Sequence, residues 1–316
     1  MKKALAILLC FTMLIGSLCA CGNAHKSDDG KLKIVVTIFP EYDWLRVLMG
    51  EHFRDAEVHM LLDSGTDLHN YQPTAQDMAL ITDCDLFVYI GGESDEWVEE
   101  TLSAVGGNQK ILCMMDIISG LAEEFSEGMQ AEEDVEDEGA KDEHIWLSLK
   151  NAQELVKALC GALCEVDSES CETYRANCKS YCQSLAELDE AYSEMCAQAA
   201  YFTILVADRF PFRYLTEDYG LDYYAAFPGC AAASDISFET VGFLAQKLKD
   251  LALPAVIIID GSDSKVAQTI IESAGTNAKV LMLDSCQCVS SKEIEDGANY
   301  LDKMISNLEI LREALN

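Results

Sequence analysis

Short runs of apolar and β-branched residues alternate along most of the chain with segments of helical periodicity. This alternation is typical of a parallel sheet that is covered by helices on both faces. In the first half it predicts one α/β lobe. The expected strands cover residues 33–38, 57–62, 86–91 and 111–115, and the expected helices cover residues 42–50, 74–82 and 96–105.

The second half of the chain repeats the same alternation after residue 200. It therefore indicates a second α/β lobe. The expected strands cover residues 202–207, 222–227, 255–259 and 279–283, and the expected helices cover residues 212–218, 238–251, 264–273 and 292–315.

Residues 150–200 lie between these halves and have helical periodicity without any strand-like run. A weak interruption at residues 166–170 predicts a shorter helix followed by one long helix. A helix of about 28 residues is roughly 40 Å long at 1.5 Å per residue, which makes it a strut. The predicted fold class is therefore α/β, with two parallel-sheet lobes at residues 33–149 and 201–316 joined by a long rigid helix.

The N-terminus has the pattern of a bacterial lipoprotein signal. Two lysines precede an apolar run that is too short to span the ~30 Å hydrocarbon core of a bilayer. Ala20 and Cys21 follow, which suits a cleavage box whose cysteine takes the lipid. We expect residues 1–21 to be a signal peptide, Cys21 to be the lipidation site and residues 22–32 to be a tether. The alternative is an ordinary secretory signal with an incidental cysteine.

The composition limits the possible partners. The 316 residues are half apolar, which is ample for a large core, and the formal net charge is -33. Nucleic-acid binding needs a basic face, so 22 basic against 55 acidic residues exclude that class and favour cationic partners. After the N-terminus no run is long and apolar enough to span a membrane. The lipoprotein signal predicts an extracytoplasmic protein that is attached to the cell membrane by its lipid.

Residues 122–143 are rich in acids and poor in apolar residues. Such a segment cannot form a core, so we expect a mobile surface loop. It is either a solvated insertion or a weak collector of cations.

The fourteen cysteines are too many to ignore, but a chain of this size needs no disulfide staples. Many of those in the helical region are four or seven residues apart, which favours a role as small buried apolar residues over structural bridges. No Cys-x-x-Cys pair occurs, so a thiolate zinc knuckle has no support. The cysteines of this region are Cys160, Cys164, Cys171, Cys178, Cys182 and Cys196.

Two of the five histidines lie where open α/β sheets place ligand groups. His69 follows a predicted strand and precedes a predicted helix, and His144 lies where the acidic segment rejoins the fold. His25, His52 and His59 fall in the tether, at a helix end and inside a strand, where surface or core roles are expected.

Acidic residues end three predicted strands of the second lobe, namely Asp208, Asp260 and Asp284. Any one of them could simply cap the helix that follows. Two imidazoles and two carboxylates that converge in a cleft would suit a divalent metal. Nitrogen ligands favour zinc, and oxygen ligands leave manganese possible.

Several separated motifs, in this order, resemble the zinc- and manganese-binding lipoproteins of metal ABC transporters, the solute-binding proteins of cluster A-I type. The motifs are the lipobox, residues 33–40, 67–74 and 143–146, the long linking helix and residues 300–315. The resemblance implies two α/β lobes with one metal in the cleft between them. It also implies that the protein is not an enzyme, and that as a monomer it captures zinc or manganese and delivers the ion to an ABC permease.

The same resemblance implies the ligands. His69 and His144 match the two ligands of the family's first lobe, and Asp284 matches its last carboxylate. The remaining ligand is usually a histidine or glutamate after the first strand of the second lobe, where this chain has Asp208 and Arg209. We assign Asp208, because an arginine has no lone pair to offer a cation.

Some alternatives stay open from the sequence. Asp260 could replace Asp208 as the fourth ligand. Zinc-binding members of the family often have a histidine-rich loop where this chain has its acidic segment, so zinc and manganese are both retained. The same fold could serve a surface adhesin or bind another solute. A metallohydrolase would need an open coordination position and a general base, and neither His-Glu-x-x-His nor Gly-x-Ser-x-Gly occurs.

Overall fold

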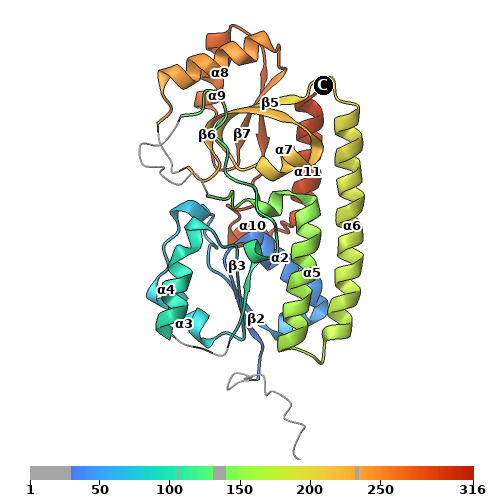
Figure 1. Ribbon diagram of the computed structural model, residues 1–316. Helices are drawn as coiled ribbons and strands as arrows, with labels where there is room; N and C mark the ends of the chain where they lie inside the picture. Colours follow the sequence, from blue (N-terminus) through green and yellow to red (C-terminus); the bar gives the residue numbers. More distant parts are fainter. Residues whose placement is uncertain (1–29, 106, 108, 131–139, 232–234) are drawn as a thin grey trace, which may run out of the picture.

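The computed structural model describes residues 30–316 except 106, 108, 131–139 and 232–234. The predicted signal peptide with Cys21 lies outside the described residues. The fold class is the predicted one, with two α/β lobes stacked beside a pair of long helices (Figure 1). No helix of the described part is long and apolar enough to cross a membrane.

The first lobe has a four-stranded sheet of order β2-β1-β3-β4, and all neighbouring strands are parallel. On the central strand, Ile34 and Val36 face the main core, and Val35 faces a smaller cluster on the other side. The sheet is therefore buried on both faces, as parallel sheets are. Its elements are β1 (Lys33–Val36), α2 (Phe39–Met49), β2 (Glu57–Met60), α3 (Ala75–Asp83), β3 (Leu86–Tyr89), α4 (Glu96–Val105) and β4 (Lys110–Cys113).

The second lobe has the equivalent order β6-β5-β7-β8, again with parallel neighbours. Ile204 and Val206 face the main core, and Leu205 faces a cluster on the outer side of the sheet. The elements are β5 (Thr203–Phe210), α7 (Arg213–Tyr219), β6 (Asp222–Pro228), α8 (Phe238–Asp250), β7 (Ala255–Ile259), α9 (Lys265–Ala274), β8 (Lys279–Leu283), α10 (Ser291–Glu295) and α11 (Tyr300–Ala314).

Two helices join the lobes, α5 (Leu149–Val166) and α6 (Cys171–Ala197). At 27 residues, α6 is roughly 40 Å long and runs beside both lobes in Figure 1, as the prediction of a strut requires. Cys164 and Cys171 form a disulfide across the turn between the two helices, so the expectation of unbridged cysteines is wrong for this pair. The pairing arises because the short interruption brings two helix ends together. Cys160, Cys178 and Cys196 are buried and free, as expected.

The lobes share one continuous core in addition to the strut. The main hydrophobic cluster includes residues of both sheets and of both linking helices. Helix α11, at the end of the chain, packs against β8 in its own lobe and against α2 and α6. Tyr192 on α6 also donates its hydroxyl to the backbone oxygen of Met304 on α11, at 2.6 Å. The shared packing supports a fixed arrangement of the two lobes.

The last predicted helix is wrong in its extent, because residues 292–315 form two helices. Gly297 between α10 and α11 has a φ of 101°, which a continuing helix does not allow. Asn299 then begins α11, since its side chain accepts a hydrogen bond from the backbone nitrogen of Asp302 at 2.9 Å. Strand β5 continues to Phe210, beyond its predicted end.

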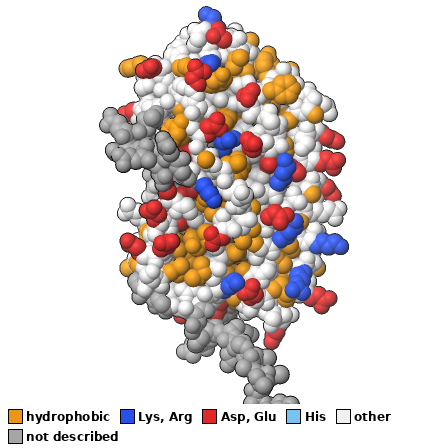
Figure 2. All heavy atoms as spheres, viewed as in Figure 1, with side chains coloured by type: hydrophobic (Ala, Val, Ile, Leu, Met, Phe, Trp, Pro, Cys, Tyr) orange, Lys and Arg blue, Asp and Glu red, His pale blue; other side chains and the backbone are white. Residues whose placement is uncertain are grey.

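The described ends of the acidic segment lie against the second lobe, which differs from the expected mobile loop. Glu124 pairs with Arg213 on α7 at 3.0 Å, and Glu127 pairs with Lys247 on α8 at 3.1 Å. Residues 131–139 are outside the described part. Acidic side chains are also spread over the face drawn in Figure 2, with basic side chains among them.

Candidate metal centre

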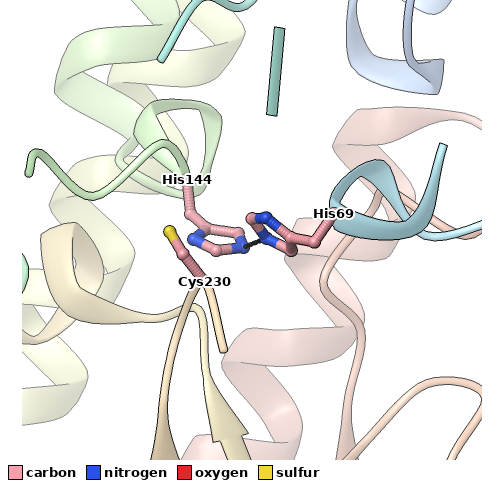
Figure 3. Close-up of side chains that lie close together, drawn as sticks. All are labelled: His69, His144 and Cys230. Carbon is pink, nitrogen blue, oxygen red and sulfur yellow. Dashed lines mark hydrogen bonds between the residues drawn. The ribbon is translucent and has the colours of Figure 1, made fainter. Parts of the chain in front are cut away.

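Two histidines of the first lobe face each other where the lobes meet (Figure 3). His69 lies on a short 3-10 helix, η2 (Leu68–Asn70), that is capped by Asp67, whose Oδ1 accepts the backbone N–H of His69 at 2.9 Å. His144 is completely buried immediately before η5 (Ile145–Leu147). The two Nε2 atoms are 3.2 Å apart.

The other ring nitrogens already have partners. His144 Nδ1 lies 3.0 Å from Asp142 Oδ1, and His69 Nδ1 lies 2.8 Å from Ser94 Oγ. A carboxylate only accepts, so the bond to Asp142 places the proton of His144 on Nδ1 and leaves the lone pair on Nε2. Burial, and next the neighbouring His144, lower the pKa of His69 to about 3, so this ring is neutral near pH 7. The arrangement therefore directs imidazole nitrogen toward a shared point.

Glu143 supports this pair from one side. Its Oε1 accepts the backbone N–H of Ser94 at 2.8 Å, and its Oε2 lies 3.6 Å from His69 Nδ1. Gly92 makes this approach possible, because an added Cβ there would lie 2.4 Å from Glu143 Oε1. Burial raises the pKa of the Glu143 carboxyl. These contacts resemble the carboxylate partners that orient metal-binding histidines in other proteins.

Cys230 approaches the histidines from the second lobe. It follows β6, and its ligand atom and those of His69 and His144 all lie within 4.8 Å of one another. In the part of the chain that the structure describes, this is the one group of three or more possible ligands at such a spacing. Gly229 allows the approach, since an added Cβ would lie 2.8 Å from Phe210 O and 3.3 Å from His144 Cε1. We call these three residues the His–His–Cys group.

Asp208 bonds to the backbone of the residue that follows it. Its Oδ1 accepts the backbone N–H of Arg209 at 2.8 Å. The guanidinium of Arg209 forms an ion pair with Asp67, which also accepts a hydrogen bond from Gln287 Nε2 at 3.2 Å. Two residues of the second lobe thus bind a carboxylate of the first, beside the His–His–Cys group. Asp208 itself is not a member of that group among the described residues.

Asp284 ends β8, as predicted, and also lies outside the group as described. Its Oδ1 accepts the backbone N–H of Cys286 at 2.8 Å, and its Oδ2 forms an ion pair with Lys303 on α11. Asp260 accepts the backbone N–H of Ser285. Burial and then the charge of Asp284 raise the pKa of Asp260. In this structure each of these carboxylates therefore bonds to backbone N–H groups or to a basic side chain. The assignment of Asp208 and Asp284 as ligands stays a prediction.

Sequence reasoning missed Cys230. It was one of fourteen cysteines, and neither helical spacing nor a Cys-x-x-Cys motif separated it from the rest. The signal that could have found it is its position, directly after Pro228 and Gly229 at the carboxyl end of a strand, where the histidines and aspartates were sought.

Comparison with known proteins gives one consistent result. The family model described as "Zinc-uptake complex component A periplasmic" matches residues 34–314. The chain is 30% identical over 311 residues to the zinc-binding lipoprotein AdcA of Streptococcus pneumoniae R6, covering 96% of this chain and 60% of that protein. It is 28% identical over 318 residues to the high-affinity zinc uptake system protein ZnuA of Bacillus subtilis, covering 98% and 96%.

Among solved structures, the crystal structure of Zn(II)-bound AdcA from Streptococcus pneumoniae is similar, with a TM-score of 0.74 and 26% identity. That match covers 90% of this chain and 58% of the other. The chain thus spans about 60% of the length of its AdcA relative.

Proposed function

The chain belongs to the family of periplasmic zinc-uptake components, and on this premise we propose that it captures zinc outside the cytoplasm and delivers it to a membrane permease. Zinc is preferred to manganese as cargo because the relatives are named for zinc. The proposal includes an ABC permease as the partner and a lipid anchor at Cys21, and it treats the protein as a monomeric binding protein without enzymatic activity.

The observation that carries the proposal is the pair of imidazole nitrogens at 3.2 Å. Two nitrogen ligands at 2.0–2.1 Å from a tetrahedral zinc ion are about 3.3 Å apart. The two Nε2 atoms therefore already have the separation that one zinc ion needs. Without an ion, one of the two Nε2 atoms carries a proton and donates it to the other in a hydrogen bond, so zinc would take the place of that proton.

The surroundings favour capture of a cation and also its release. Asp142 and Glu143 lie beside the histidines, so a bound cation would be close to two carboxyl groups and would favour the ionised form of Glu143 that burial disfavours. A site formed where two lobes meet can be opened by a partner that separates them slightly. The shared core and the α6 strut keep such a movement small. Delivery would then depend on contact with the permease.

Zinc titration of the chain that lacks residues 1–21 tests this proposal. We expect about one zinc ion per chain, with a dissociation constant well below 1 μM, equivalent to more than about 8 kcal/mol of binding free energy. Manganese should compete weakly. A wild-type protein that binds neither metal more tightly than about 1 mM would overturn the transport function.

A pair of aspartate variants tests the carboxylate ligands. Asp284→Ala is expected to weaken zinc binding about 10- to 100-fold. The reason is that the Asp284 carboxylate could give up its ion pair with Lys303 and bind the zinc ion instead, from the same lobe as Cys230. Asp208→Ala is expected to change affinity less than about threefold, because Asp208 is bonded to its own neighbour's N–H and lies beside the positive charge of Arg209. Competition with a chromogenic chelator measures both. If Asp208→Ala weakened zinc binding more than Asp284→Ala, Asp208 and not Asp284 would be the carboxylate ligand.

A further inference from the structure

We propose that Cys230 is the third protein ligand of the transported ion, so that a thiolate selects zinc over manganese. This inference rests on the proposed function, since it concerns the same ion. It gives the site two imidazoles from the first lobe and one sulfur from the second. Three protein ligands leave a tetrahedral ion one further position, for Asp284 or for water.

The distances support a shared ion. A sulfur at 2.3 Å and a nitrogen at 2.0–2.1 Å from a tetrahedral zinc are about 3.6 Å apart. The three possible ligand atoms of the His–His–Cys group already lie within 4.8 Å of one another. In Figure 3 the two imidazoles face each other and Cys230 lies beside the His144 ring, and the three residues come from segments far apart in the chain. From the upper limit of 4.8 Å, shortening the sulfur–nitrogen separation by roughly 1.2 Å gives the geometry that zinc prefers.

The loop that presents Cys230 is held in place at Cys230 itself and at the preceding Gly229. Its backbone N–H donates to Glu123 Oε1 at 2.9 Å, and Glu123 in turn donates its own N–H to Ala140 O at 2.9 Å. Gly229 packs against the carbonyl of Phe210 without room for a Cβ. The described start of the acidic segment therefore holds the cysteine loop of the opposite lobe in place. That contact gives Glu123 a positioning role at the site.

The chemistry of the ligands narrows the cargo. Thiolate ligands select zinc and other thiophilic ions, whereas manganese prefers carboxylate, carbonyl and water oxygen. When the ion binds, the S–H bond of Cys230 breaks, a sulfur–metal bond forms and the proton leaves to solvent. No electron transfer is involved. A site with this sulfur would bind manganese poorly even where the carboxylates nearby would accept it.

Cobalt substitution provides a direct test, because Co²⁺ occupies zinc sites and a Co²⁺–thiolate bond gives an intense near-ultraviolet charge-transfer band. The wild-type chain lacking residues 1–21 is loaded with one equivalent of Co²⁺, and its spectrum is compared with those of Cys230→Ser and Cys288→Ser. Cys288 is the matched control, a half-buried free cysteine of the same lobe that is not a member of the group. Competition titrations with zinc and manganese accompany the spectra.

We expect the band in the wild type and in Cys288→Ser, and its loss in Cys230→Ser. Zinc affinity should fall at least about 100-fold in Cys230→Ser, beyond the 10- to 100-fold typical of losing an outer partner. The ratio of zinc affinity to manganese affinity should be at least about tenfold smaller in Cys230→Ser than in the wild type. The presence or absence of the thiolate band in the wild-type protein is itself a test. The result therefore does not depend on whether Cys230→Ser folds well.

The outcomes separate the two proposals. A wild-type protein that binds zinc tightly but shows no thiolate band with cobalt would overturn the role of Cys230 and leave the transport function standing. The same holds if Cys230→Ser binds zinc as tightly as the wild type while His69→Ala does not bind. A wild type that binds no metal would overturn both.

Discussion

Replacing His144 with alanine is expected to reduce zinc affinity at least about 1,000-fold, which corresponds to about 4 kcal/mol of binding free energy. The substitution removes one of two nitrogens that face each other at 3.2 Å. It also leaves Asp142 without the ring N–H that it accepts at 3.0 Å, so a buried carboxylate loses a partner as well. The first effect weakens zinc binding, and the second lowers the stability of the folded protein. Isothermal titration calorimetry with competition for tight binding gives the size of the loss.

Two comparisons make the His144 result specific. Asp142→Asn keeps the imidazole but weakens the acceptor behind it, and should cost about 10- to 100-fold. His59→Ala changes an exposed histidine on β2 and should leave zinc affinity unchanged. If His144→Ala bound zinc within tenfold of the wild type, the facing imidazoles would not be the ligands, and another site would have to be sought.

Regular elements of this fold were predictable because each is specified by local pattern. The bounds of α4, β7 and β8 agree with the alternation of apolar residues in the sequence. The errors occur where one residue changes the backbone locally. Gly297 divides the last predicted helix, and its effect depends on a positive φ that periodicity does not reveal.

The candidate site was only partly predictable, for a different physical reason. His69 and His144 occupy strand-end and loop-end positions that topology brings together, so a reading of the sheet suffices to propose them. Cys230 becomes relevant only through its distance to them, which depends on how the two lobes pack. The ion pair of Arg209 with Asp67 has the same origin. Arg209 therefore connects the two lobes, a role that the sequence alone did not indicate.

The Trp146 ring packs beside His144, and we expect Trp146→Ala to lower the free energy of unfolding by about 3–5 kcal/mol. Trp146 is completely buried, and its ring lies 5.2 Å from the ring of His144. Its indole N–H donates to Ser285 O of the second lobe at 2.7 Å, and its carbonyl accepts the hydroxyl of Tyr300 at 2.5 Å. Removing the ring leaves a large cavity where the lobes join and an acceptor without its donor.

Trp146→Phe separates the two contributions, because it retains most of the ring but not the N–H. We expect a loss of about 1–3 kcal/mol for this variant. Urea unfolding of metal-free protein, in the presence of a chelator, measures both changes without the stabilisation that a bound ion adds. Zinc affinity should also fall in Trp146→Ala, since His144 loses the surface against which its ring is packed. If the free energy of unfolding of Trp146→Ala were within about 1 kcal/mol of the wild-type value, the lobes would be joined chiefly through α6 and α11. The histidine pair would then not depend on the contact with Trp146.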